Sequence, residues 1–208
     1  KTQEDWNDKN NLKFILKYAD DTDSELFNYM LENKAAFEKE LGAAKIAGKI
    51  ENLIYQKIYD EERNADLEKL EQLFNKVYPP KQAAQAIARF KVNYYLEKRS
   101  SKKYAEAAID FYKKFPAQHP SELTDVAYNF YELDVSKKKY LKQGLKWTKS
   151  AIEEDPSYFN YETLGAVYYR MKKKKKARKA LMKAIELAKA QNEDFSETQQ
   201  LLDKVNGK

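Results

Sequence analysis

Apolar residues recur at intervals of three and four along most of this chain, which is the spacing of an amphipathic helix. The pattern is clearest over residues 157–190, where large residues alternate with Gly or Ala. Large side chains in such a pattern fill the space between two helices, and small residues let the backbones approach. We therefore predict two antiparallel helices in close contact, built on Tyr161, Leu164, Gly165, Tyr168, Ala177, Leu181 and Ala184.

The same spacing predicts further helices, which become regular pairs after residue 80. Pro79-Pro80, Pro116 and Pro120 interrupt the helical pattern. Two helix starts have the spacing of a capping box, Thr22 with Glu25 and Ser196 with Gln199. The other expected helices cover residues 6–18, 24–31, 35–41, 43–59, 65–77, 81–96, 102–115, 121–133, 138–153 and 196–205.

The composition agrees with a helical fold. The 208 residues include only five Gly and five Pro, too few for the many tight turns of an all-β protein. Lys, Glu, Leu and Ala are abundant, and all four favour helix. No apolar run approaches the roughly 18 residues of a membrane-spanning helix, so we expect no transmembrane segment. The expected fold class is all-α.

The pattern over residues 157–190 resembles the tetratricopeptide repeat, a helix–turn–helix unit of about 34 residues. That family has W-x2-L-G-x2-Y in its first helix and A-x3-F in its second. Here Tyr161 stands at the Trp position, and Leu181 stands at the second aromatic position. The resemblance implies antiparallel helix pairs stacked as a right-handed solenoid that presents a groove to peptides or partner helices. Residues 81–208 would hold about three pairs and a capping helix, although the helix-to-helix interval varies between pairs.

Residues 6–60 resemble the helical segment that follows the thioredoxin-like domain in some cell-envelope proteins of Bacteroidetes-type bacteria. The resemblance implies a place in the periplasm or cell envelope. It also implies that any redox chemistry lies outside this chain, because a chain without Cys has no C-x-x-C. Since the chain begins at Lys1 without Met, we expect a processed form or an excised part of a longer protein. The resemblance is carried by the order of Trp6, Ile15, Tyr18, Asp21, Ser24, Phe27, Leu31, Asn33, Phe37 and Gly42.

Charge divides the chain into two parts near Pro79-Pro80. Residues 1–80 hold 12 basic and 17 acidic residues, a net charge of −5, and residues 81–208 hold 27 and 16, a net charge of +11. We therefore expect an acidic helical region over residues 1–80, built from degenerate helix pairs, and a basic repeat region over residues 81–208. The basic region could steer an acidic partner, or its charges could be ordinary solvated helix surface.

Each first helix of the three pairs carries two adjacent aromatic residues, which core packing alone does not explain. Adjacent helical residues point about 100° apart, so both cannot face the second helix of the pair. We predict that Tyr94, Phe130 and Tyr168 face the core and that the second residue of each doublet lines a groove for a protein or peptide. The alternative is that these second residues pack between repeats. The predicted groove residues are Tyr95, Tyr128, Tyr131, Glu132, Glu162, Tyr169 and Arg170.

Five consecutive lysines lie at the expected turn of the third pair. Such a run could bind an anionic membrane surface or nucleic acid, or it could be a solvated turn of a Lys-rich chain. No RNA- or DNA-binding motif accompanies it, so we expect no nucleic-acid partner. This basic patch is Lys172, Lys173, Lys174, Lys175 and Lys176.

Other chemistry finds little support in the sequence. Asp21, Asp23, Glu25 and Glu32 match calcium-loop positions, but Leu26 stands where the loop needs Gly, and a helix cap explains the same residues. A lone His119 without a partner His or Cys favours a place near a helix start over a metal site. The G-x-S-x-G, Walker and dinucleotide-binding motifs are missing. We therefore expect no catalytic residues, metal or cofactor within this chain.

The function expected from these patterns is a non-catalytic protein-interaction or scaffold module. By resemblance, it would be the helical portion of an envelope protein related to thiol–disulfide oxidoreductases. One alternative is a purely structural accessory domain of a larger envelope enzyme. The other is an anionic-surface binder that acts through the basic region. Oligomeric state and partner identity stay open at this point.

Overall fold

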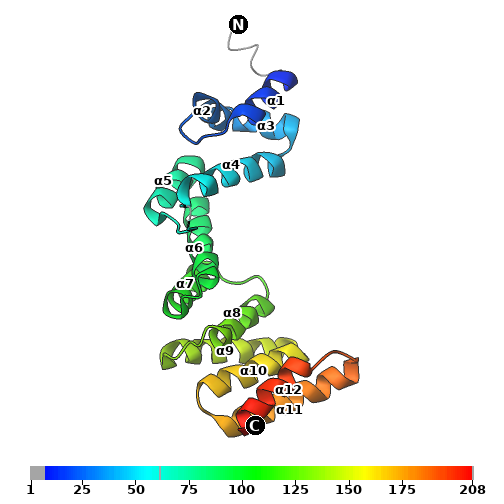
Figure 1. The fold of residues 1–208 in the computed structure, drawn as a ribbon. Coiled ribbons are helices and arrows are strands. Elements are labelled where there is room, and N and C mark those ends of the chain that lie inside the picture. Colours follow the sequence, from blue (N-terminus) through cyan, green and yellow to red (C-terminus); the bar gives the residue numbers. More distant parts are fainter. Residues whose placement is uncertain (1–7, 61, 208) are drawn as a thin grey trace. The chain divides into compact units, whose positions relative to one another are not determined.

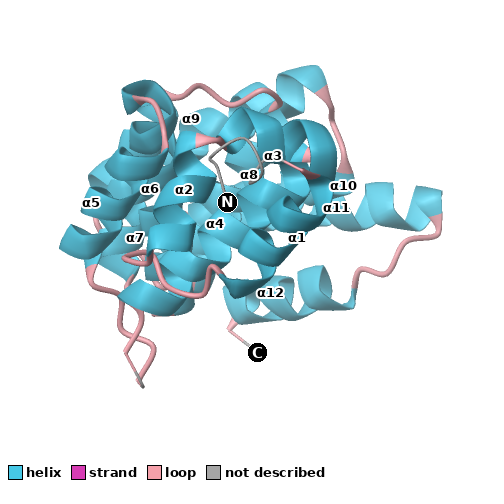
Figure 2. Cartoon of the chain, turned by 90° about the horizontal axis from the view of Figure 1, so that it is seen from above, coloured by secondary structure: helices cyan, strands magenta, loops and turns pink. Residues whose placement is uncertain are grey.

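The computed structural model of the protein describes residues 8–60 and 62–207. Within these ranges the chain is a series of α-helices joined by short loops, with an isolated bridge between Tyr59 and Ala65 and no strand (Figure 2). The all-α prediction is confirmed, whereas Trp6 lies outside the described residues. The helices in Figure 1 are α1 Lys9–Tyr18, α2 Glu25–Glu32, α3 Lys34–Leu41, α4 Ala43–Ile58, α5 Leu67–Val77, α6 Pro80–Glu97, α7 Ser101–Lys114, α8 Pro120–Glu132, α9 Lys138–Glu154, α10 Tyr158–Arg170, α11 Lys174–Gln191 and α12 Ser196–Asn206.

The chain divides into two compact units, Lys1–Ile87 and Ala88–Lys208. The division between Ile87 and Ala88 falls inside α6. This helix begins at Pro80, the second residue of the Pro79-Pro80 pair. The two units are therefore described separately.

The first unit packs α1 to α5 around a core of aliphatic and aromatic side chains. Its N-terminal part is tied together by Lys57 of α4, whose ammonium group contacts Asp21 at 2.9 Å and Asp23 at 3.0 Å. Helix α2 is capped by Ser24, whose Oγ accepts a hydrogen bond from the Phe27 N–H at 3.1 Å. The predicted capping box of Thr22 is wrong, because the cap lies two residues later and Thr22 is fully buried. Its fully buried side chains include Leu12, Ile15, Phe27, Met30, Phe37, Ile46, Ile50, Ile54, Leu70 and Phe74.

From α8 to α12 the second unit is built from successive contacts between neighbouring helices, whereas α7 makes few contacts with α8 and α9. Helix α8 packs against α9, α10 packs against both of them and against α11, and α12 packs against α11 and α10. Gly165 of α10 is where two backbones come close, since a Cβ built there would lie 2.5 Å from Cγ of Leu181 in α11. The predicted close contact of these two helices is confirmed. One core cluster centres on Tyr104, Phe111, Phe130, Tyr140 and Trp147, and a second on Ala166, Tyr168, Leu181, Leu201 and Val205.

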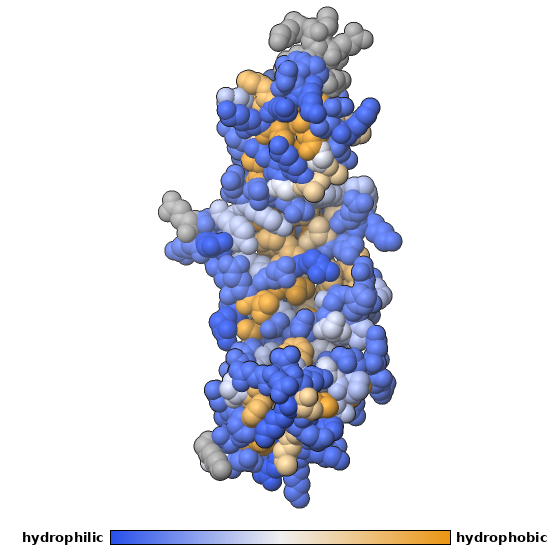
Figure 3. Space-filling model, turned by 90° about the vertical axis from the view of Figure 1, so that its right-hand side faces the viewer, coloured by the Kyte–Doolittle hydropathy of each residue, from blue (hydrophilic) through white to orange (hydrophobic). Residues whose placement is uncertain are grey.

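Two helix starts in this unit depend on local side chains. At α8, Glu122 accepts hydrogen bonds from the backbone N–H groups of Gln118 and His119, so His119 lies at a helix start as predicted. At α12, Asp194 accepts hydrogen bonds from both the N–H and the hydroxyl of Ser196. The predicted Ser196–Gln199 capping box is therefore wrong, because Asp194 takes its place. The face drawn in Figure 3 is mostly hydrophilic, with smaller hydrophobic patches between.

Candidate functional site

Three turns with the same backbone geometry set the register of α6, α8 and α10. Two residues after the end of each helix stands a non-glycine residue of positive φ, namely Arg99, Asp134 and Lys172, at intervals of 35 and 38 residues. In each turn the residue after the positive-φ residue donates its backbone N–H to a carbonyl oxygen in the last turn of the helix. These bonds run from Ser100 to Tyr95 O, from Val135 to Phe130 O and from Lys173 to Tyr168 O, at 2.9 Å each.

This register corrects the place of Tyr95. By its turn, Tyr95 is equivalent to Phe130 and Tyr168, which are buried in the two core clusters. Tyr95 accordingly packs against the core cluster around Tyr104, with its ring 5.4 Å from that of Tyr94. The prediction that Tyr95 is equivalent to Tyr131 and Tyr169 is wrong by one residue, and Leu96 takes that position.

A pocket of about 370 Å³ opens between α8 and α12, and we call it the α8–α12 pocket. The lining comes from α8 and α12, and α10 packs against both of these helices. The pocket unites three of the predicted groove residues with residues from the last helix of the chain. Its lining is Tyr128, Asn129, Tyr131, Glu132, Glu197, Gln200, Leu201 and Lys204.

Aromatic rings form a continuous wall that runs from this pocket to α10. The ring of Tyr128 lies 5.8 Å from that of Tyr131 and 5.8 Å from that of Phe159. Tyr131 in turn meets Tyr169 of α10 edge to face at 6.3 Å. All three tyrosines are half-buried, so their rings are held by neighbours while part of each stays accessible.

Glu162 of α10 is a buried carboxylate beside this pocket. Its residue is 7% exposed, and its Oε1 is buried with no hydrogen-bond partner among the described residues. Burial raises the pKa of Glu162, a hydrogen bond from Thr198 opposes that shift, and the charge of Glu197 adds to it. Glu162 is therefore a buried carboxyl group whose hydrogen-bonding capacity its surroundings only partly satisfy.

The hydroxyl of Tyr128 lies in the field of several carboxylates. Its pKa is raised above the usual value, first by burial and then by the charges of Glu162, Glu132 and Glu197. These carboxylates come from α10, α8 and α12, so folding alone brings them together. Tyr128 therefore lies close to carboxyl groups from three helices.

A second pocket of about 370 Å³ shares one lining residue with the first. It is lined by residues of α6, α7 and α8, among them Arg89, Asn93, Leu96, Asp125 and Asn129. Asn129 lines both pockets and is fixed by a hydrogen bond of 3.0 Å from its amide to the hydroxyl of Tyr104. The two pockets thus have Asn129 as a common lining residue.

Arg170, the last predicted groove residue, is engaged elsewhere. Its guanidinium contacts Asp134 at 2.5 Å, in the turn after α8. Glu197, Gln200 and Lys204 were not predicted as site residues, because nothing in a short helical segment indicates which distant helix it will face. Asn129 was not predicted either. It lies between the predicted groove residue Tyr128 and the core residue Phe130, and a polar residue at that place in the sequence could have indicated it.

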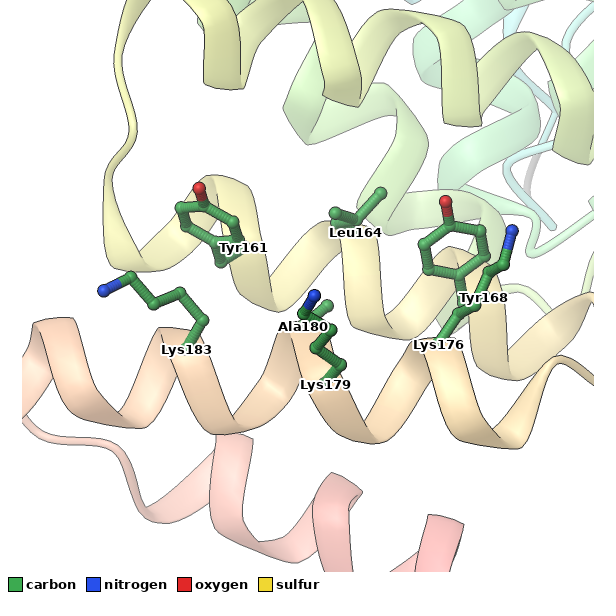
Figure 4. A pocket seen from close by; sticks show the side chains of 7 residues that line it. All are labelled: Tyr161, Leu164, Tyr168, Lys176, Lys179, Ala180 and Lys183. Carbon is green, nitrogen blue, oxygen red and sulfur yellow. The ribbon is translucent and has the colours of Figure 1, made fainter.

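A separate pocket of about 470 Å³ lies between α10 and α11 (Figure 4). The α10 side presents Tyr161, Leu164 and Tyr168, and three lysines of α11 border it. Lys183 is bound to Glu186 at 2.7 Å, and Lys176 lies 5.7 Å from the centre of the Tyr168 ring. Two of its ammonium groups therefore already have partners, which makes this pocket a weaker candidate than the α8–α12 pocket.

The remaining candidates do not form sites in the described residues. The lysines from Lys172 to Lys176 are all exposed, in the turn after α10 and the first turn of α11. The part of the chain that the structure describes contains no group of three or more His, Cys, Asp or Glu residues placed for a metal ion. No helix within residues 8–60 and 62–207 combines the length and the apolar character needed to cross a membrane.

Comparison of the chain with protein-family models, with curated proteins and with solved structures finds no significant match. The functional interpretation therefore depends on the geometry of the chain itself.

Proposed function

We propose that the protein is a non-catalytic, peptide-binding interaction module, and that its second unit is a tetratricopeptide-like helix array. The ligand would be an extended segment of another protein. It would lie along the α8–α12 pocket and continue past Asn129 into the pocket between α6 and α8.

The observation that carries the proposal is the wall of half-buried rings formed by Tyr128, Tyr131 and Tyr169. Tyrosines offer a large contact area and a hydroxyl at little cost in side-chain entropy, and they are enriched where proteins bind other proteins. The repeated turns at Arg99, Asp134 and Lys172 support a helix-repeat architecture. Repeat proteins commonly use the face lined by equivalent positions of successive repeats for binding.

The test begins with a random displayed-peptide library selected on the full chain. Affinities of enriched peptides are then measured by fluorescence anisotropy for the wild type and for Tyr131→Ala and Tyr169→Ala. A buried aromatic at the centre of an interface typically contributes at least ~1 kcal/mol, so each variant should weaken binding about fivefold or more.

Tyr161→Ala is the matched control. It removes the same side chain from the same helix as Tyr169→Ala, but at the pocket between α10 and α11. Peptide affinity should be unchanged in this variant, and circular dichroism checks that all three variants are folded. A library that enriches no peptide, or equal losses in all three variants, would refute the proposed function.

The setting implied by the N-terminal resemblance is a separate proposal. If the chain is the helical part of an envelope thioredoxin-like protein, the sequence of the full-length gene product should contain a C-x-x-C domain and a signal peptide. A full-length product without them would leave the peptide-binding proposal standing alone.

A further inference from the structure

We infer that the segment bound by the α8–α12 pocket is basic and places a Lys or Arg side chain beside Tyr128, among Glu132, Glu162 and Glu197. This inference rests on the proposed function and adds the chemistry of its partner. The inferred partner is opposite in charge to the one that the net positive charge of residues 81–208 would favour, which is an acidic partner.

The sign of the local charge is opposite to that of its surroundings. Residues 81–208 carry a net charge of +11, yet three carboxylates act on the Tyr128 hydroxyl. In the lining of the pocket two carboxylates, Glu132 and Glu197, stand against one basic residue, Lys204, and Glu162 is a third carboxyl group close to Tyr128. The structure therefore leaves room for positive charge from a ligand.

Glu162 is the strongest indication of a ligand. A buried carboxylate without full hydrogen bonding costs free energy, which the chain does not recover through its own contacts. Oε1 of Glu162 has no partner among the described residues, and its other contact is the hydroxyl of Thr198. An ammonium or guanidinium group that reached this carboxylate would supply the missing donor.

The aromatic wall suits the same ligand. Lys and Arg side chains lay their aliphatic stems along apolar surface and hold their charge against aromatic faces. Tyr128, Tyr131 and Phe159 provide such a surface next to the carboxylates. The pocket between α10 and α11, by contrast, is bordered by Lys176, Lys179 and Lys183, so a basic segment would be repelled there.

The displayed-peptide selection supplies the first test. Enriched peptides should contain more Lys and Arg than the unselected library. Peptides that are neutral or acidic but still lose affinity on Tyr131→Ala would overturn this inference while leaving the proposed function intact. A library without any enrichment would overturn both.

Defined probes give the second test. Three short labelled peptides of one design carry Lys, Gln or Glu at the same alternate positions, and anisotropy with the full chain should rank them in that order. Glu162→Gln should weaken the Lys peptide by about tenfold or more, the effect of losing a charge-assisted hydrogen bond. Glu197→Gln should weaken it only about two- to fivefold, because that carboxylate is exposed.

The matched control is Glu186→Gln, which removes the same charge from the same unit. Glu186 lies on α11, paired with Lys183 and outside the α8–α12 pocket. Affinity for the Lys peptide should not change. If Glu186→Gln and Glu197→Gln lost equal affinity for the Lys peptide, the effect would come from the net charge of the protein rather than from the pocket, and the inference would be overturned.

A charge reversal covers the case in which Glu162→Gln disturbs folding. Glu132 and Glu197 are both exposed, so Glu132→Lys with Glu197→Lys should leave the core intact. This double variant should lose the Lys peptide and gain affinity for the Glu peptide. Undiminished binding of the Lys peptide would place its site elsewhere and refute the inference.

Discussion

Three glycines inside helices predict opposite effects of one substitution. Replacing Gly by Ala in a helix interior stabilises it by ~1 kcal/mol, because Gly has the larger backbone entropy in the unfolded chain. Packing then decides the sign. A Cβ at Gly48 would meet nothing within 4 Å, at Gly144 it would lie 3.2 Å from Phe130 Cδ2, and at Gly165 it would lie 2.5 Å from Leu181 Cγ.

We therefore expect Gly48→Ala to raise the free energy of unfolding by about 0.5–1 kcal/mol. Gly144→Ala should be close to neutral, because Phe130 has to yield by only a few tenths of an ångström. At Gly165 the methyl group meets the branched carbon of a fully buried leucine. Overpacking of this kind costs about 1–3 kcal/mol, so Gly165→Ala should be destabilising by up to about 2 kcal/mol after the helix gain of ~1 kcal/mol is subtracted.

A double-mutant cycle isolates the contact. Leu181→Ala alone should cost about 2–5 kcal/mol by leaving a cavity. In that background the obstacle is gone, so Gly165→Ala should now stabilise by ~1 kcal/mol. The sign of the Gly165 effect thus reverses, which a change in helix propensity alone would never produce.

Urea unfolding followed by far-UV circular dichroism measures these effects. In a Trp6→Phe background, emission comes from Trp147 alone, since the chain has two Trp. Trp147 packs against Tyr112 and Phe130, so it reports on the second unit, whereas Gly48 lies in the first. If Gly165→Ala stabilised the second unit as much as Gly48→Ala stabilises the first, the close approach of α10 and α11 would be refuted.

Two further predictions concern single side chains of the second unit. Phe130 is fully buried between Tyr104 and Trp147, so Phe130→Ala should lower the free energy of unfolding by about 3–5 kcal/mol, and a urea midpoint near that of the wild type would contradict this packing. Glu162→Gln should raise the thermal midpoint at pH 7, because a carboxyl whose folded pKa is raised costs stability once pH exceeds its unfolded pKa of about 4.3. The gain should vanish below that pH, where both states are protonated, and a gain that persisted at low pH would contradict the assigned cause.

The helices were predictable from the sequence because their apolar spacing is strong. The expected segment 121–133 is observed as Pro120–Glu132, and 138–153 as Lys138–Glu154. Gly165 was also identified correctly, since a glycine among large apolar residues indicates a close approach. These features depend on residues near one another in the chain, where periodicity carries the information.

The register of α6 failed for a local reason. Tyr94 and Tyr95 are both aromatic, so hydrophobicity could not show which of them faces the core. The turn after α6 fixes the register, but its positive-φ residue is Arg99 rather than Gly, so the turn was not recognisable from the sequence. A signal was nevertheless present. Leu96-Glu97 precedes one turn as Tyr131-Glu132 precedes the next, which aligns Leu96 with Tyr131 and assigns Tyr95 to the core.

The candidate site was only partly predictable. Tyr128, Tyr131, Glu132 and Tyr169 follow from helix periodicity, but Glu197 lies in a separate helix whose partner no local pattern reveals. Glu162 was predicted on the groove, and only the packing of α12, through Thr198, accounts for its burial. The chemistry of the site therefore depends on a contact between segments about 36 residues apart, near the length of one such repeat.

Helix α10 separates two surfaces of opposite charge. Tyr161, Leu164 and Tyr168 face the lysines of α11, whereas Glu162 and Tyr169 belong to the face shared with α8 and α12. Under the proposed function, a basic segment would be attracted to the carboxylates on one side of this helix and repelled by the lysines on the other. Charge would then select the face as well as the ligand. The buried charge of Glu162 is a cost in stability, which a bound basic segment would offset by neutralising it.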